Sequence, residues 1–95
     1  MKLRLILLTG ILAFFGQRAQ AQCTAAAYST QNGATVTFYD SSYSVNGHDA
    51  YWGFGDGSGG YGTTVSHTYT ANGTYMASLY IYDSLANCDD TTYLT

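Results

Sequence analysis

Positive charge is missing from most of this chain, and proline is missing from all of it. The three cationic residues are Lys2, Arg4 and Arg18, so residues 22–95 contain no lysine and no arginine. The acidic residues all lie in that stretch: Asp40, Asp49, Asp56, Asp83, Asp89 and Asp90. Six acids and no cations give it a net charge of −6. Nucleic acid and anionic membrane surfaces are bound through cations that face phosphate groups, so both are excluded as partners.

The first 21 residues have the features of a cleaved secretory signal. A basic start is followed by an apolar stretch over residues 5–15, and Ala19-Gln-Ala21 supplies the small residues that signal peptidase requires. An apolar stretch this short cannot form a permanent transmembrane helix. We therefore expect residues 1–21 to be removed and residues 22–95 to form a secreted or cell-surface bacterial domain that does not insert into the membrane.

Cysteine occurs only at Cys23 and Cys88, near the two ends of this expected mature domain. In an exported protein such a pair predicts one disulfide. It would close a loop of about 66 residues, which the chain-entropy model values at roughly 4 kcal/mol. A domain of this size has only a modest core, so the disulfide would supply a large share of its stability.

No segment after residue 21 has apolar residues at helical spacing. Alternation with a period of two is clear instead, and it places Tyr75, Ala77, Leu79 and Ile81 on one face of a single run. The strands that we expect are 24–29, 34–40, 48–54, 63–69, 74–83 and 88–94, with a short extra one near 43–45. Six or seven short strands separated by Asn-Gly and Asp-Gly turns predict one all-β domain, an antiparallel β-sandwich.

The most informative motif is Trp52-Gly-Phe-Gly-Asp-Gly-Ser58, followed by Val65-Ser-His-Thr-Tyr69 and Asn72-Gly-Thr-Tyr75. This order resembles the PKD (polycystic kidney disease) domain of secreted bacterial proteins, with its pattern W-D-F-G-D-G, H-x-Y and G-x-Y. The matching positions are Trp52, Phe54, Gly55, Asp56, Gly57, His67, Tyr69, Gly73 and Tyr75. The resemblance covers Cys23 to Thr95. It implies an immunoglobulin-like sandwich that is not catalytic and serves in spacing, protein contact or polymer binding.

Elementary physics gives each part of this motif a structural role. Trp52 and Phe54 share strand parity, so both can face the core. Asp56 can accept hydrogen bonds from amides of its own turn. We expect Tyr69 and Tyr75 to bury their rings and to bond their hydroxyls to the backbone. The glycines from 55 to 62 are expected to form a tight turn and a mobile loop. Gly53 replaces the first aspartate of the family pattern, so no role of that carboxylate carries over.

Three arrangements that resemble catalytic motifs lack the necessary context. The segment Gly55–Gly60 fits G-x-G-x-x-G, but dinucleotide binding needs a helix to begin there. The spacing of the same segment differs from that around a serine-protease nucleophile. Ser66 and His67 are adjacent on a strand and point to opposite faces, so they cannot act as nucleophile and base. We expect no enzymatic activity, and a packed or hydrogen-bonded role for His67.

Metal binding has only compositional support. His48 and Asp49 are expected in an exposed turn, and neither histidine belongs to a cluster with zinc spacing. Four acids at strand ends or in loops could offer oxygen ligands to Ca²⁺, namely Asp40, Asp83, Asp89 and Asp90. No EF-hand pattern accompanies them, so solvated surface acids are the alternative. No other cofactor is expected.

The tyrosines are the remaining unusual feature, because all ten lie after residue 21. If Leu79 faces inward, then Met76, Tyr80 and Tyr82 line the outer face of the same strand. Exposed aromatic residues can stack on sugar rings or contact a protein, and cross-strand tyrosine pairing is the structural alternative. We therefore expect a secreted, non-catalytic module that contacts extracellular protein or polymer or acts as a spacer. The alternatives are a carbohydrate-binding module and an accessory domain of a larger exported enzyme or adhesin.

Overall fold

The protein is represented by a computed structural model that describes residues 22–95, and the expected signal sequence lies outside these residues. The described part of the chain forms nine strands: β1 (Cys23–Thr24), β2 (Ala27–Asn32), β3 (Thr35–Asp40), β4 (Tyr43–Ser44), β5 (Asp49–Gly53), β6 (Gly59–Tyr61), β7 (Thr64–Thr68), β8 (Ala77–Asp83) and β9 (Cys88–Leu94). It contains no helix that is long and apolar enough to cross a membrane.

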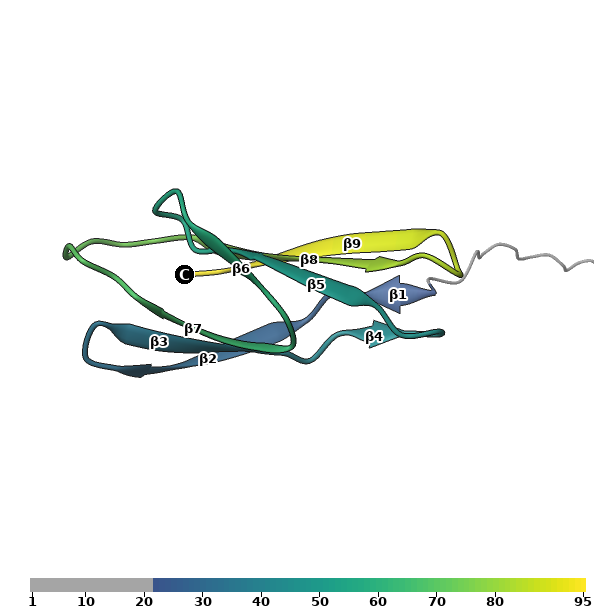
Figure 1. Cartoon of the computed structure of the whole chain (residues 1–95), viewed down its shortest axis with the longest axis horizontal. Coiled ribbons are helices and arrows are strands. Elements are labelled where there is room, and N and C mark those ends of the chain that lie inside the picture. The colour runs from purple at the N-terminus through teal and green to yellow at the C-terminus, as the bar shows by residue number, and fades with distance from the viewer. Residues whose placement is uncertain (1–21) are drawn as a thin grey trace, which may run out of the picture.

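The strands form two stacked layers (Figure 1). One layer is the antiparallel sheet β2-β3-β7, and the other is the antiparallel sheet β6-β5-β8-β9. The short strands β1 and β4 pair with each other at one end of the sandwich. The all-β, immunoglobulin-like sandwich expected from the sequence is confirmed.

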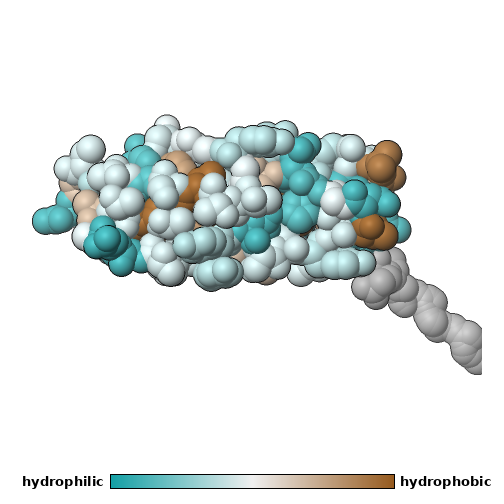
Figure 2. All heavy atoms as spheres, turned by 60° about the horizontal axis from the view of Figure 1, so that its bottom comes forward, coloured by the Kyte–Doolittle hydropathy of each residue, from teal (hydrophilic) through white to brown (hydrophobic). Residues whose placement is uncertain are grey.

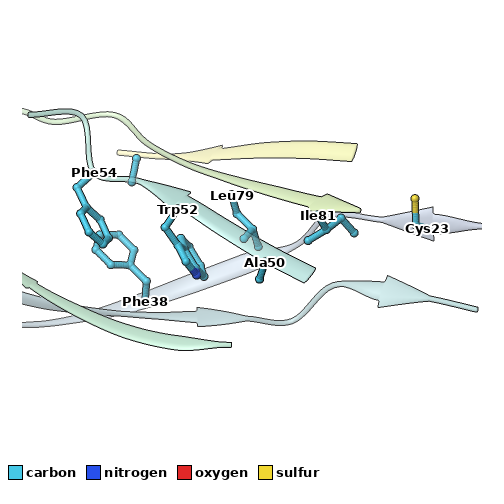
Figure 3. Packing of buried hydrophobic residues seen from close by; sticks show 8 residues of the cluster. Cys23, Phe38, Ala50, Trp52, Phe54, Leu79 and Ile81 are labelled. Carbon is cyan, nitrogen blue, oxygen red and sulfur yellow. The ribbon is translucent and has the colours of Figure 1, made fainter. Parts of the chain in front are cut away.

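The core lies between the two layers and is built by alternation along the strands (Figure 3). Along β8, Ala77, Leu79 and Ile81 are buried, with Leu79 and Ile81 completely inaccessible to solvent. Phe38 projects from β3 in the opposite layer toward Trp52 and Phe54. Each fully buried Leu, Ile or Phe side chain contributes about 1.5–3 kcal/mol of transfer free energy. This one small core holds the two layers together, and so it fixes the outer face of each layer.

Three details of the expected strand pattern were wrong. The glycine-rich segment beyond Phe54 does not remain a loop throughout, because Gly59–Tyr61 pairs with β5 as strand β6. The first expected strand is divided into β1 and β2, and the long strand begins at Ala77 instead of residue 74. In each case the ends of the strands depend on pairing with a distant segment, which a local pattern does not contain.

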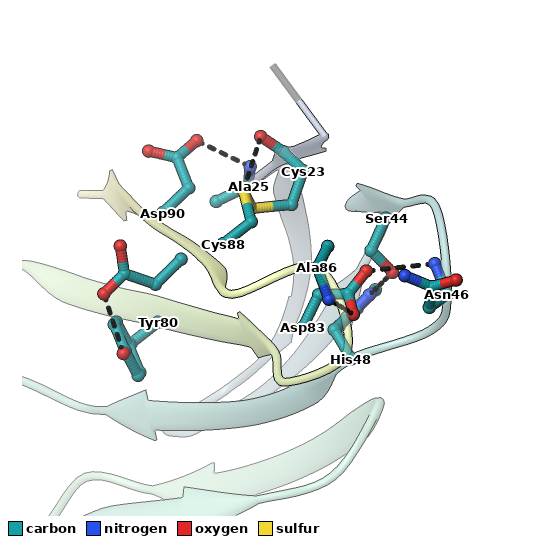
Figure 4. Close-up of a disulfide and its surroundings, with 11 residues drawn as sticks. Cys23, Ala25, Ser44, Asn46, His48, Tyr80, Asp83, Ala86, Cys88 and Asp90 are labelled. Carbon is teal, nitrogen blue, oxygen red and sulfur yellow. Dashed lines mark hydrogen bonds between the residues drawn. A yellow bond between two sulfur atoms is a disulfide. The ribbon is translucent and has the colours of Figure 1, made fainter. Parts of the chain in front are cut away.

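The expected disulfide is confirmed, since Cys23 and Cys88 are bonded across 65 positions of sequence. It joins β1 to the start of β9 at the end of the sandwich (Figure 4). Cys23 is buried at 4% exposure and belongs to the core cluster. The crosslink therefore fixes the N-terminal strand to the four-stranded layer, where β1 has only a two-residue pairing with β4.

The surface is mostly polar. Figure 2 shows one face of the molecule, on which teal and pale side chains predominate and brown hydrophobic atoms are confined to small patches. The most exposed apolar side chain among the described residues is Leu85, at 83%. It lies in the turn between β8 and β9, and single hydrophobic side chains of this kind are common on the surface of folded proteins.

Candidate functional site

The indole of Trp52 forms the centre of the core beneath the sequence motif. Trp52 is 4% exposed and Phe54 is 3% exposed, and both rings pack on Phe38 of the opposite layer with centroid distances of 5.4 and 5.3 Å. The Trp52 Nε1–H donates a hydrogen bond to the carbonyl oxygen of Gly62 at 2.8 Å. The indole therefore joins the two sheets and also fixes the chain that follows β6.

A continuous series of stacked rings extends from this centre. The Phe54 ring lies parallel to the His67 imidazole at 4.3 Å, and His67 meets the edge of Tyr69 at 4.6 Å. Tyr69 in turn stacks on Tyr75 at 4.3 Å. The hydroxyl of Tyr69 donates to the carbonyl of Phe54, and that of Tyr75 donates to the carbonyl of Ala71. These four motif side chains are thus used in packing one another.

Asp56 closes the turn that follows Phe54. Its Oδ1 accepts hydrogen bonds from the backbone N–H and the hydroxyl of Ser58, and its Oδ2 lies 2.7 Å from Nε2 of His67. The bonds from Ser58 and then from His67 lower the pKa of the Asp56 carboxyl from 3.8 to about 2, because they stabilise its charged form. The turn is therefore attached to β7 by a charged group that stays ionised.

Glycine is required at one position of this turn. Gly55 has a φ of +85°, and a Cβ atom there would lie 2.6 Å from the carbonyl oxygen of Met76. Gly57 has a similar φ of +94°, but a Cβ atom there would meet nothing within 4 Å. Gly73 lies next to the ring of Tyr75. Gly55 is therefore required by the close approach of the Met76 backbone as well as by its positive φ.

The structure brings Ser58 close to His67 and Asp56, which the sequence did not indicate. The Ser58 hydroxyl is 3.3 Å from Nε2 of His67, the same nitrogen that contacts Asp56. In a catalytic triad the acid and the nucleophile contact opposite nitrogens of the ring, so that a proton can pass between them. Here one nitrogen serves both partners, and the Ser58 hydroxyl already donates to Asp56. This arrangement holds a turn in place.

A groove of about 550 Å³ opens between the layers near Tyr69 and Tyr75. Its lining includes the apolar side chains Val36, Phe38 and Leu94 and the loop 70–74. None of the described residues that line it is an aspartate, glutamate, histidine, cysteine or lysine. The groove therefore offers shape and hydroxyl groups but no acid–base pair.

Three tyrosines gather on the outer face of the four-stranded layer, and we call Tyr51, Tyr61 and Tyr80 the tyrosine face. Tyr51 lies directly opposite both Tyr61 of β6 and Tyr80 of β8 in the strand register. The ring centroids are 5.1 and 6.1 Å apart, and the side chains are 46%, 62% and 37% exposed. Of the expected ligand residues, Tyr80 is therefore part of this cluster. Met76 is exposed but precedes β8, and Tyr82 is half-buried.

Two carboxylates border the tyrosine face. The Tyr61 hydroxyl donates to Asp49 at 2.8 Å, and the Tyr80 hydroxyl donates to Asp89 at 3.0 Å; Figure 4 draws the Tyr80 bond. These hydrogen bonds raise the pKa of Tyr61 and of Tyr80 above 10.0, because removing the phenolic proton would leave two negative groups in contact. Both hydroxyls therefore remain protonated donors under physiological conditions.

His48 does not lie in the exposed turn that the sequence suggested. Its side chain is only 13% exposed, and its two ring nitrogens contact Ser44 and Asp40, each at 2.6 Å. Burial raises the pKa of the Asp40 carboxyl, but hydrogen bonds from Ser42 and His48 outweigh this and lower it below 3.8. His48 lies between β4 and β5 and reaches Asp40 at the end of β3, and this contact was not visible in the local sequence.

The other acids considered for Ca²⁺ also accept hydrogen bonds from protein groups. Asp83 is 1% exposed and bonds the backbone N–H groups of Asn46 and Ala86 (Figure 4). Although burial raises the pKa of Asp83, these bonds lower it below 3.8. Asp90 accepts the N–H of Ala25. Within residues 22–95, no three His, Cys, Asp or Glu side chains come together as a metal site would require.

Comparisons with known proteins place this geometry in a family. A sequence model of the PKD domain matches residues 18–95. A search among curated proteins finds no match. Among solved structures, the PKD1 domain of Vibrio anguillarum Epp is 27% identical, with a TM-score of 0.71 over 79% of this chain and 89% of that one. The PKD1 domain of the Vibrio cholerae metalloprotease PrtV is 22% identical, with a TM-score of 0.68 over 74% of this chain and 88% of that one. Because the family match spans most of the sequence, the chain belongs to the PKD domain family.

Proposed function

We propose that residues 22–95 act outside the cell as a non-catalytic accessory module of an exported bacterial protein. The observation that carries this proposal is the internal use of the motif side chains. Phe54, His67, Tyr69 and Tyr75 stack on one another, and Asp56 binds its own turn and His67. Groups that hold each other in this way are satisfied by the fold and are not available for substrate chemistry.

The similar solved domains support an accessory role. One of them is the first PKD domain of a metalloprotease, where it is a module beside another activity. A module of this kind needs a rigid body and a contact surface. The disulfide between Cys23 and Cys88 and the Trp52-centred core provide the rigid body. The tyrosine face is the contact surface that we assign to it, since exposed aromatic clusters on a sheet are typical of interaction sites.

Export and activity assays test this proposal together. The full chain is expressed in a bacterial host, and the exported material is incubated with fluorogenic peptide, ester and glycoside substrates. We expect the protein outside the cytoplasm, without its first 21 residues, and no turnover above that of buffer. His67→Gln serves as a matched variant. Turnover that disappears in folded His67→Gln would overturn the non-catalytic assignment, and retention in the cytoplasm would overturn the extracellular one.

A further inference from the structure

The tyrosine face combines electron-rich rings with carboxylates at its border. Tyr51 lies between Tyr61 and Tyr80 in the register, so three neighbouring rings are reachable from solvent. Asp49 and Asp89 are exposed and each accepts one phenolic hydrogen bond from this cluster. A carboxylate offers about four acceptor positions, so both acids keep capacity for an external donor.

The charges of the rest of the domain make this face selective for cations. None of residues 22–95 is a lysine or an arginine, and the two histidines contact Asp40 and Asp56, so no cationic side chain of this stretch pairs with Asp49 or Asp89. All six acids of the sequence add to the same negative field. Opposite charges accelerate encounter and like charges suppress it, so a partner must supply the positive charge that this domain lacks.

Ring orientation favours a cation over a sugar at this position. The Tyr51 ring is tilted by 57° from Tyr61 and by 36° from Tyr80. The three rings therefore do not form the flat platform on which a polysaccharide chain could stack several sugar units. The rings of Tyr51, Tyr61 and Tyr80 are 46%, 62% and 37% exposed, so a guanidinium or ammonium group can approach a ring face from solvent to within the distance of about 6 Å at which the ring attracts it.

We propose that the tyrosine face binds an arginine- or lysine-rich segment of a partner protein. The rings hold the cationic head groups, and Asp49 and Asp89 accept their N–H donors. This inference rests on the proposed function, because it names the partner chemistry of the contact surface assigned there. It also gives the phenolic hydrogen bonds a role. Each one holds a carboxylate beside a ring, so that one cation can contact both.

Binding of short labelled peptides to the full exported chain tests the inference. The probes are oligoarginine, oligolysine and oligoglutamate of equal length, with soluble chitin and cellulose oligosaccharides as neutral competitors. Tyr51→Val removes the central ring while keeping a residue that favours strands. Tyr28→Val is the matched control, because Tyr28 is 54% exposed on the other layer. Asp49→Asn/Asp89→Asn removes two charges at the face. Its control, Asp56→Asn/Asp90→Asn, removes two charges elsewhere. Circular dichroism establishes that both variants are folded before binding is compared, because Asp56 and Asp90 accept backbone hydrogen bonds.

We expect both cationic peptides to bind, oligoglutamate not to bind, and affinity to fall with rising salt. An exposed cation–π contact is worth about 0.5–1 kcal/mol, so Tyr51→Val should weaken oligoarginine binding about two- to fivefold and Tyr28→Val should not. The Asp49/Asp89 double variant should weaken it more than the Asp56/Asp90 variant.

Three other outcomes would contradict the proposal. Equal losses from both charge variants would mean that the peptide responds only to net charge, and the inference would be wrong. Oligosaccharide binding that Tyr51→Val reduces would overturn the cationic partner but would leave the contact role of this face intact. Absence of any ligand at this face would overturn the inference, while the export and turnover assays would still decide the accessory role separately.

Discussion

Substitution of Gly55 by alanine is the sharpest test of why the motif has its glycines. Two costs combine at this position. Alanine at a φ of +85° is strained by about 1–2 kcal/mol. The new Cβ atom would also lie 2.6 Å from the Met76 carbonyl oxygen, which is backbone and cannot rotate away. Overpacking of this kind costs about 1–3 kcal/mol. We therefore expect Gly55→Ala to lower the free energy of unfolding by about 2–5 kcal/mol.

Gly57→Ala separates the two costs. Its φ of +94° imposes similar strain, but its Cβ atom would meet nothing within 4 Å. Urea denaturation of both variants, followed by circular dichroism, should show Gly55→Ala to be less stable than Gly57→Ala by the cost of the clash alone. Equal stability of the two variants would show that residue 55 does not approach Met76 closely in the folded protein.

Three further predictions concern the parts that hold the domain together. Cys23→Ala/Cys88→Ala should lose roughly 4 kcal/mol of stability in urea denaturation, and an unchanged midpoint would show that the disulfide does not restrain the unfolded chain. The pKa of Asp56 is about 2 in the fold and ordinarily 3.8, so its contribution to stability is present above pH 3.8 and is lost as pH falls toward 2. Asp56→Asn should flatten the stability profile in that window, and a profile identical to that of the wild type would contradict the shift. Trp52→Phe leaves the Gly62 carbonyl without its donor. This should lower the free energy of unfolding by about 1–3 kcal/mol, in addition to the loss from the smaller ring. Unchanged stability in thermal melts would exclude that hydrogen bond.

The features that depend on local sequence patterns or on motif order were predictable from the sequence. Alternation along residues 77–83 identified the buried face of β8, because a strand directs successive side chains to opposite sides. The two cysteines, near the two ends of a domain that the sequence predicts to be exported, identified the disulfide. The order of the tryptophan, histidine and tyrosine motifs identified the family, since each piece is weak alone but the spacing is specific.

The features that depend on long-range pairing were not predictable. The sequence of β6, Gly59-Gly60-Tyr61, has no alternation of polar and apolar residues, so only its backbone pairing with β5 defines it as a strand. Without β6, Tyr61 could not be placed next to Tyr51, and the tyrosine face stayed hidden. His48 was misplaced for a similar reason, because it lies in the loop between β4 and β5 and its partner Asp40 lies at the end of β3. Register between strands distant in sequence is set by the whole sheet and not by local composition.

The motif of this domain builds the fold, whereas the partner contact that we propose lies on the outer face of the four-stranded layer. An NMR titration of the isotope-labelled chain with oligoarginine distinguishes these two roles. We predict chemical-shift changes centred on Tyr51, Tyr61 and Tyr80, with the signals of Asp56 and His67 unchanged. Changes centred on Asp56 and His67, with the tyrosine signals constant, would contradict this assignment.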